Sequence, residues 1–413
     1  MDPSAKRHEQ GVTSALALAL LSAALLLSMS VWLSASAVLP ALTSVWRVSG
    51  AAGWLSASVQ IGFSAGALTS ALLGLADRVA PRRMFMLASF AAALCNAAFA
   101  IWGGDLAAGL VLRLLTGAAL AAVYPVAVKL LAEWFPTSRG VAMGIMIAGL
   151  TLGSALPHLL HGGVGALAPW QVVVGSCSAL AVAGGLIVWL FLPDSPGTAT
   201  THGFRWDALP HVVRNRPVVL ATLGYFGHNW ELYGMWVWLP AFLYQSWSHY
   251  TAAGRLAGDS EFAAFVVIGV AGAVGALVGG RIADQYGRAR TILVAMTASG
   301  LCALAIGWTF PGPPWVTLAV ALLWGIAVIA DSAQFSAAVT ELSDPAWVGT
   351  ALTFQLSAGF LVTVISINVV PWLQVLGGWR WAFSILSLGP AVGILAMARL
   401  QREPRPAGRI SAS

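Results

Sequence analysis

Two titratable side chains, His228 and Glu231, lie inside an otherwise apolar and aromatic-rich stretch that runs GYFGHNWELYGMWVWLP. They are three residues apart, so on a helix they share one face. An acidic residue in the middle of a lipid bilayer costs roughly 2.5–3.5 kcal/mol. We therefore expect Glu231 to be protonated, paired or in contact with water, and each of these states suits proton exchange or ligand binding.

Among the acidic residues, only Asp331 lies as deep in an apolar run as Glu231, and Arg113 is the one deeply placed cation. Gln334 follows Asp331 by one helical turn, on the same face. Because Arg113 precedes both acids by more than a hundred residues, a charge pair or a bound anion could bridge distant parts of the chain. The alternatives are a structural hydrogen bond within the bundle for Glu231 and a solvated position near the cytoplasmic mouth for Asp331. For Arg113 the alternative is that it braces helices at the outer half of the fourth span. Weaker polar candidates at similar depth are Tyr124, Asn229 and Gln355.

The sequence gives no support for a metal site, a cofactor or an enzyme. His158 and His161, in ALPHLLHGG, are three residues apart but lack further ligands at metal-binding spacing. The three cysteines are widely separated and are interpreted as packing residues. No GxxxxGK[ST], HExxH or GxSxG motif is present. We therefore expect neither a built-in ATPase nor a hydrolase.

Transmembrane helices must position these residues. Of 413 residues, 59% are hydrophobic and only 9% are charged, and the mean hydropathy is +0.82. A span needs about 20 apolar residues, which is longer than the roughly ten-residue strands of a membrane barrel. We predict an all-α polytopic membrane protein with twelve transmembrane helices. The predicted spans are 13–37, 52–75, 84–102, 106–131, 140–160, 170–192, 218–246, 262–281, 290–309, 314–338, 348–370 and 379–399.

The basic residues indicate topology rather than a nucleic-acid partner. The net charge is +6, but the 21 Lys and Arg residues are dispersed through short loops. With both termini in the cytoplasm, only Arg47, Arg255 and Arg380 fall outside, and Arg113 falls within a span. This agrees with the excess of cationic residues in cytoplasmic loops. We predict a monomer in the lipid bilayer of the cell membrane, plasma or inner.

The chain divides into two similar halves. Residues 193–217 form the longest predicted cytoplasmic connection, a linker between six-helix bundles at 1–192 and 218–413. Asp77 and Asp284 follow the second and eighth spans at an offset of 207 residues, and Glu133 and Glu341 end the fourth and tenth spans at an offset of 208. Two pairs of matching residues with nearly the same offset predict that the six-helix unit is duplicated.

The loop sequences carry a family resemblance. GRIADQYGRAR matches the signature G-x-x-x-D-x-x-G-R-x-R of the major facilitator superfamily, and RLLTGAAL resembles its fourth-helix arginine motif. The resemblance implies two six-helix bundles that rock about a central site. Ionic contacts of the loops are expected to favour one conformation. The residues concerned are Asp77, Arg78, Arg82 and Arg83 in the first copy and Gly280, Asp284, Gly287, Arg288 and Arg290 in the second. The first copy departs from the signature, with Leu73 and Ala80 at its glycine positions.

We predict a secondary transporter that moves a small organic solute, with an anion suggested by Arg113, by alternating access. Protons are the expected coupling ion, through Glu231, Asp331 or both. Many drug exporters of the family carry a glycine-rich fifth-helix motif with a Gly-Pro pair. The corresponding stretch here, GIMIAGLTLGSALPHLL, lacks the pair, which favours uptake or facilitated exchange. The alternatives are a proton-driven drug or metabolite exporter and, from another class, a non-transporting membrane sensor on the same scaffold.

Overall fold

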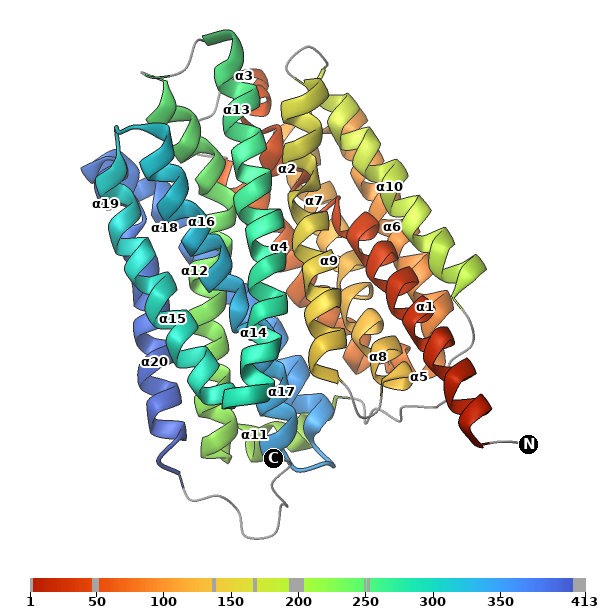
Figure 1. The fold of residues 1–413 in the computed structure, drawn as a ribbon. Coiled ribbons are helices and arrows are strands. Elements are labelled where there is room, and N and C mark those ends of the chain that lie inside the picture. Colours follow the sequence, from red (N-terminus) through yellow and green to blue (C-terminus); the bar gives the residue numbers. More distant parts are fainter. Residues whose placement is uncertain are drawn as a thin grey trace.

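The computed structural model describes residues 3–46, 52–135, 139–165, 169–192, 204–248, 250 and 253–403, which form helices and no strand (Figure 1). The elements of the first half are α1 (Pro3–Met29), α2 (Ser34–Ala37), α3 (Leu39–Trp46), α4 (Ala52–Leu72), α5 (Leu75–Arg78), α6 (Pro81–Trp102), α7 (Leu106–Leu120), α8 (Tyr124–Trp134), α9 (Arg139–Leu160), the π-helical η2 (His161–Gly165) and α10 (Trp170–Phe191).

The later elements begin with η3 (Trp206–Ala208) and α11 (Leu209–Arg214), which fall within the predicted linker, whose residues 193–203 lie outside the described part. The others are α12 (Arg216–Trp247), α13 (Ala253–Phe265), the π-helical η4 (Val266–Ala271), α14 (Gly272–Tyr286), α15 (Arg288–Ala305), η5 (Ile306–Thr309), α16 (Pro314–Ala330), α17 (Ser332–Leu342), α18 (Val348–Gly377), α19 (Trp379–Ala382), η6 (Ser384–Ser387) and α20 (Leu388–Leu400).

The predicted all-α membrane fold is confirmed. Within the described ranges, ten helices are long and apolar enough to cross a membrane. Helix α1 contributes a shorter apolar segment, Ser14–Met29, and α12 is not among the ten because its polar side chains lower its hydropathy. These two helices coincide with the first and seventh predicted spans, so the set is consistent with twelve spans.

Several of the predicted spans contain a short interruption of the α-helix. The first span ends at Met29 and the chain resumes a helix at Ser34. The fourth span divides into α7 and α8, and the tenth into α16 and α17. In the fourth span the second helix, α8, starts at Tyr124, and in the tenth span the second helix, α17, starts at Ser332. These starts are 208 residues apart, which is the offset of Glu133 and Glu341 in the sequence repeat.

Helices within each half pack closely, and α4 and α9 of the first half also pack against the second half. In the second half, a Cβ placed on Gly227 of α12 would lie 2.2 Å from the carbonyl oxygen of Gly389 in the first turn of α20, so the two backbones are in contact. Small residues permit such close approach between membrane helices. Between the halves, α4 packs against α18 and α9 against α13, η4 and α14. Figure 1 shows α9 beside α14 at the front of the molecule.

The two ends of the molecule are distinguished by the chain ends. Helix α1 begins and α20 ends at the lower end in Figure 1, which we call the terminal end, and α13 begins at the opposite, far end. At the terminal end, Gly287 has φ +88° and begins α15. In the first copy of the loop, Gly74 instead has φ +61°. Positive φ favours glycine. In the first copy the residue with positive φ is therefore Gly74, which follows Leu73, and not Ala80, the counterpart of Gly287.

Candidate functional site

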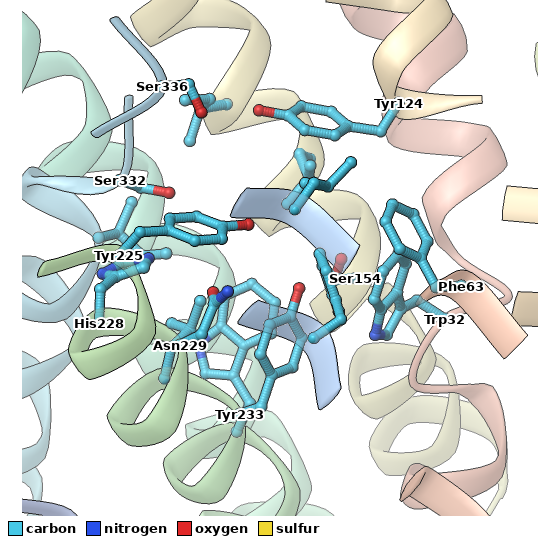
Figure 2. Close-up of a pocket in the computed structure, with 17 residues that line it drawn as sticks. Trp32, Phe63, Tyr124, Ser154, Tyr225, His228, Asn229, Tyr233, Ser332 and Ser336 are labelled. Carbon is cyan, nitrogen blue, oxygen red and sulfur yellow. The ribbon is translucent and has the colours of Figure 1, made fainter. Parts of the chain in front are cut away.

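A cavity lies between the halves, in the middle of the helix assembly (Figure 2). It has about 50 Å³ of space for water-sized molecules. That is room for a few waters, each needing roughly 10–15 Å³, but not for an organic solute. Its lining residues are Trp32, Phe63, Tyr124, Ile147, Leu150, Ser154, Tyr225, His228, Asn229, Leu232, Tyr233, Trp236, Ile329, Ser332, Ser336, Leu356 and Phe360.

Four of these side chains form an aromatic cluster across the interface between the halves. Trp32 and Phe63 come from the first half, and Tyr233 of α12 and Phe360 of α18 from the second. The Trp32 ring is stacked on Tyr233 with centroids 5.9 Å apart, and the Phe63 and Phe360 centroids are 4.2 Å apart. Rings at these separations attract one another, and a planar aromatic molecule can be held in the same way.

Hydroxyl groups line another part of the cavity. Figure 2 shows the hydroxyls of Tyr124 and Ser336 turned toward one another, with Tyr225 and Ser332 beside them. Tyr124 and Ser332 are the first residues of α8 and α17, so the two helix breaks place corresponding residues at the same cavity. Each hydroxyl can donate and accept hydrogen bonds. This part of the wall can therefore bind polar groups of a solute.

His228 and Asp331 form a buried pair at the cavity wall. The Nδ1 atom of His228 lies 2.9 Å from Oδ1 of Asp331, and their side chains are only 2% and 3% exposed. Asp331 occupies the break between α16 and α17. His228 is on the cavity lining, so the pair lies beside the cavity. Gln334 does not join this pair, because its Oε1 accepts a hydrogen bond from Arg288.

Glu231 is buried on the same helix but does not line the cavity. Its Oε2 accepts a 2.7 Å hydrogen bond from Ser299 of α15, and its Oε1 accepts a 2.8 Å bond from Trp324 Nε1 of α16. Both oxygens of the carboxyl group are therefore held by neutral donors inside the second half. Of the three expected states of Glu231, protonated, paired or in contact with water, these contacts are closest to pairing, with neutral donors in place of cations.

Arg113 is also buried within its own half, so it does not pair with Glu231 or Asp331. Its guanidinium donates to Asn96 Oδ1 at 2.8 Å and to the backbone carbonyls of Val31 and Trp32. It also donates to Ser34 Oγ. These carbonyls lie in the break after α1, where a helix C-terminus leaves acceptors unsatisfied and attracts cations. Arg113 thus stabilises the segment that presents Trp32 to the cavity.

The remaining predicted candidates differ in position. Tyr124 and Asn229 line the cavity. Gln355 is buried but is not a lining residue, and its Nε2 has no hydrogen-bond partner in the described part of the chain. In the described ranges, no cluster of three or more His, Cys, Asp or Glu side chains is arranged to hold a metal.

The loop motifs lie at the terminal end. Arg288 contacts Glu341 Oε1 at 2.7 Å and Gln334 Oε1 at 3.0 Å, which ties α15 to α17. The Asp284 carboxylate crosses to the other half, because a Cβ on Gly140 in the first turn of α9 would lie 2.6 Å from each of its oxygens. A helix N-terminus favours a negative charge. Asp284 therefore lies against the first turn of α9 in the other half.

The other motif residues have mostly external positions. Gly280 packs against the Gly140 carbonyl. Arg82 donates to the carbonyl of Trp189 at 2.9 Å. The side chain of Asp77 lies outside the described residues. Three exposed arginines complete the set, namely Arg78, Arg83 and Arg290.

Comparison with known families decides the classification. The model of the Major Facilitator Superfamily matches residues 20–367. The chain belongs to this superfamily. Its fold resembles the human organic anion transporter MFSD10, with a TM-score of 0.68 over 93% of this chain and 99% of that one, at 18% sequence identity. The family consists of transporters rather than enzymes, which agrees with the non-enzymatic prediction.

Two curated transporters are similar in sequence to this superfamily member. The gallate transporter of Pseudomonas putida is 28% identical over 314 residues, covering 65% of this chain and 66% of the relative. The 3-(3-hydroxy-phenyl)propionate transporter of Escherichia coli K12 is 32% identical over 200 residues, covering 46% and 47%. The chain thus spans about half to two thirds of these relatives.

Most of the cavity wall was not predicted from the sequence. Several lining residues are of types that are common in membrane helices, and they carry no charge that would distinguish them in the sequence. These are Phe63, Ser154, Tyr225, Tyr233 and Phe360. Trp32 and Trp236 are deep tryptophans that could have faced either lipid or the cavity. The available signal was an aromatic residue far from the ends of a span, where the interfacial role of tryptophan does not apply.

Proposed function

We propose that this protein is a secondary transporter that carries a small aromatic carboxylic acid by alternating access, together with a proton. The observation that carries the proposal is the cavity between the halves, in which the aromatic cluster lies close to the His228–Asp331 pair. The rings of Trp32 and Tyr233 suit stacking on an aromatic solute. Protonated His228 can attract a carboxylate.

The names of the relatives support the same solute class. Gallate and 3-(3-hydroxyphenyl)propionate, named in two of them, are both aromatic carboxylates with ring hydroxyls. The hydroxyl groups of Tyr124, Tyr225, Ser332 and Ser336 could form hydrogen bonds with such ring hydroxyls. We therefore favour hydroxylated benzoic and phenylpropionic acids among the aromatic acids.

For the transport cycle, we propose that residues 1–192 and 218–413 move as two bodies joined by the linker 193–217, in a monomer of the cell membrane. The terminal end would face the cytoplasm, because most of the Lys and Arg residues map to that side. Rocking of the bodies would widen the cavity toward one end and then the other. The Asp284 contact with α9 would stabilise closure of the cytoplasmic end.

For proton coupling, we propose the His228–Asp331 pair as the principal group and Glu231 as a second carrier. The pair is at the cavity wall, so a bound carboxylate can change its proton affinity directly. Glu231 lies one helical turn from His228, and in the described region its carboxyl group is hydrogen-bonded to Ser299 and Trp324. Its influence on the solute would therefore be indirect.

The test is uptake of labelled gallate, benzoate and cyclohexanecarboxylate by cells that lack other carriers for them, with and without this protein. The account predicts saturable, protein-dependent uptake of the aromatic acids, stimulated by an inward proton gradient, and little uptake of the saturated ring. Efflux driven by the same gradient would favour an exporter. Absence of uptake and of countertransport for every acid would favour a sensor on the transporter scaffold.

A further inference from the structure

One face of α12 contributes an amide group to the cavity wall. Tyr225, Asn229 and Tyr233 follow one another at intervals of four residues, so their side chains lie on the same face of the helix, and all three line the cavity. Figure 2 shows the amide of Asn229 between the two tyrosine side chains. This face therefore presents one amide, flanked by two phenol groups, to the space between the halves.

The amide nitrogen of Asn229 differs from that of every other asparagine in the chain. The sequence has four asparagines, and Asn96, Asn215 and Asn368 each donate a hydrogen bond from Nδ2 to a backbone carbonyl. The Asn229 side chain is buried, yet its Nδ2 has no hydrogen-bond partner in the described part of the chain. A buried donor without an acceptor is unfavourable, so this amide is suited to an acceptor on a bound molecule.

The neighbouring backbone of α18 leaves this amide uncovered. A Cβ placed on Gly359 would lie 2.7 Å from Nδ2 of Asn229 and 2.8 Å from Cδ1 of Tyr225. Any larger residue at position 359 would therefore occupy the space beside the amide. The glycine keeps the amide and the first tyrosine free of a covering side chain from α18.

The cavity offers few positive charges to an anion. Among the described residues that line it, none is Lys or Arg, and His228 is the one side chain that can carry a positive charge. The Nδ1 atom of His228 already faces Asp331. Arg113 donates its hydrogen bonds within the first half, to Asn96 and to backbone carbonyls. An anionic group in this cavity must therefore be bound largely by neutral donors.

The unpaired amide nitrogen fits a carboxylate better than it fits a ring hydroxyl. A carboxylate only accepts hydrogen bonds, whereas a hydroxyl also donates one and can pair with the tyrosine and serine hydroxyls of the wall. The amide nitrogen only donates, so it complements the carboxylate. Hydrogen bonds to a charged group are also stronger than those between neutral groups.

We propose that Asn229 is the residue that recognises the carboxylate of the solute, by donating hydrogen bonds from Nδ2, with Tyr225 and Tyr233 on either side of the bound group. The proposal rests on the proposed function for the class of solute. It adds the protein group that distinguishes an acid from a neutral aromatic molecule of the same shape.

The test compares benzoate with benzamide, in which an NH2 donor replaces one carboxylate oxygen. Equilibrium binding of labelled benzoate, benzamide and 4-hydroxybenzoate to the purified protein in detergent is measured at about pH 7.5, where a carboxylic acid is ionised. Asn229→Leu removes the donor at similar volume, and Asn229→Asp replaces it with an acceptor of the same shape. The matched control is Asn368→Leu, because this amide is bonded within α18 and does not line the cavity.

The wild type should bind benzoate more tightly than benzamide. Asn229→Leu should weaken binding of benzoate about ten-fold or more, as expected for a lost hydrogen bond to a charged group, and binding of 4-hydroxybenzoate by the same factor. Asn229→Asp should reverse the preference, since its carboxylate accepts from the benzamide nitrogen and repels benzoate. Asn368→Leu should bind all three compounds as the wild type does.

An unchanged preference for benzoate over benzamide in both Asn229 variants would overturn the proposal and leave the proposed function intact. A loss confined to 4-hydroxybenzoate would also overturn it, because the amide would then bind the ring hydroxyl. If the wild type binds none of the three compounds, the proposed function fails and this proposal fails with it. Elution of each variant as a single folded species is checked by gel filtration.

Discussion

At the residue scale, the two deeply buried acids of the second half differ in their partners. Asp331 contacts His228 at the cavity wall, whereas Glu231 is held by Ser299 and Trp324 away from it. We expect Asp331→Asn to lower proton-driven accumulation of an aromatic acid by about ten-fold or more, the effect of roughly 1.4 kcal/mol. Glu231→Gln should have a smaller effect. Proteoliposomes with an imposed pH gradient measure both.

The matched control for these variants is exchange without a gradient. If Asp331→Asn removes coupling alone, solute exchange at equal pH on both sides should continue. Undiminished gradient-driven accumulation in both variants would eliminate these two acids as coupling groups.

Arg113 gives a second prediction at this scale, because its contacts are to backbone carbonyls rather than to acids. Arg113→Gln would leave the backbone carbonyls of Val31 and Trp32 without the hydrogen bonds that Arg113 donates. Each unsatisfied buried acceptor lowers the free energy of unfolding by about 1–3 kcal/mol. Arg113→Lys should not rescue, since an ammonium group cannot reproduce the planar fork of donors. Thermal unfolding of the purified protein measures the loss. Arg83→Gln, at an exposed position, is the control, and equal stability of the Arg113 and Arg83 variants would refute this role.

The sequence identified the rare charged residues of the membrane interior but not their partners. Arg113, His228, Glu231 and Asp331 are conspicuous because apolar residues surround them in the chain. Pairing depends on which helices meet, and a single sequence does not specify that. Charge alone allowed Arg113 to pair with an acid of the other half. In the structure, Arg113 instead donates hydrogen bonds to the backbone carbonyls of Val31 and Trp32 in a helix break.

At the element scale, the contact of α12 with the segment that begins α20 depends on the absence of side chains at Gly227 and Gly389. A Cβ at Gly227 would lie 2.2 Å from a backbone oxygen, which cannot move as a side chain can. We expect Gly227→Ala to destabilise the protein by about 1–3 kcal/mol or more through overpacking. The control is Gly175→Ala in α10, where nothing lies within 4 Å. Thermal unfolding in detergent compares them, and equal midpoints would be inconsistent with this packing.

The helix boundaries were predicted better than the breaks. Apolar length locates a span, but the breaks at Ser30, Ala121 and Asp331 lie inside apolar sequence without a proline at the break itself. Tertiary contacts stabilise them, as Arg113 does after α1. These breaks place Trp32, Tyr124 and Ser332 at the cavity, so the features hardest to predict are those that build the site.

At the scale of the whole molecule, the near-contact of backbones at Gly162 and Gly258 gives a prediction about movement of the halves. A Cβ at Gly162 would lie 3.1 Å from the Gly258 carbonyl oxygen. In a background without native cysteines, Gly162→Cys combined with Gly258→Cys should form a disulfide that stops transport until it is reduced. Each single variant is the control. Full transport by the oxidised double variant would exclude separation of the halves at the far end.

The predicted division into halves rests on landmarks that repeat along the sequence. The offset is 207 residues for Asp77 and Asp284 and 208 for Glu133 and Glu341, and the helix starts at Tyr124 and Ser332 are also 208 residues apart. The cavity itself was not readable, since its walls combine residues such as Phe63 and Phe360 that are almost three hundred positions apart. Such contacts follow from the packing of α4 on α18, which no local pattern reveals.

The central claim is that an aromatic acid binds in the cavity between the halves. The most direct measurement is counterflow of labelled benzoate in proteoliposomes, comparing the wild type with Phe63→Ala, Tyr233→Ala and a lipid-facing control, Leu94→Ala, whose side chain is 71% exposed. Loss of an aromatic contact is worth about 0.5–1.5 kcal/mol beyond burial, so the apparent affinity should fall several-fold or more in the two cavity variants and stay unchanged in the control. Unchanged benzoate affinity in both cavity variants would contradict the account.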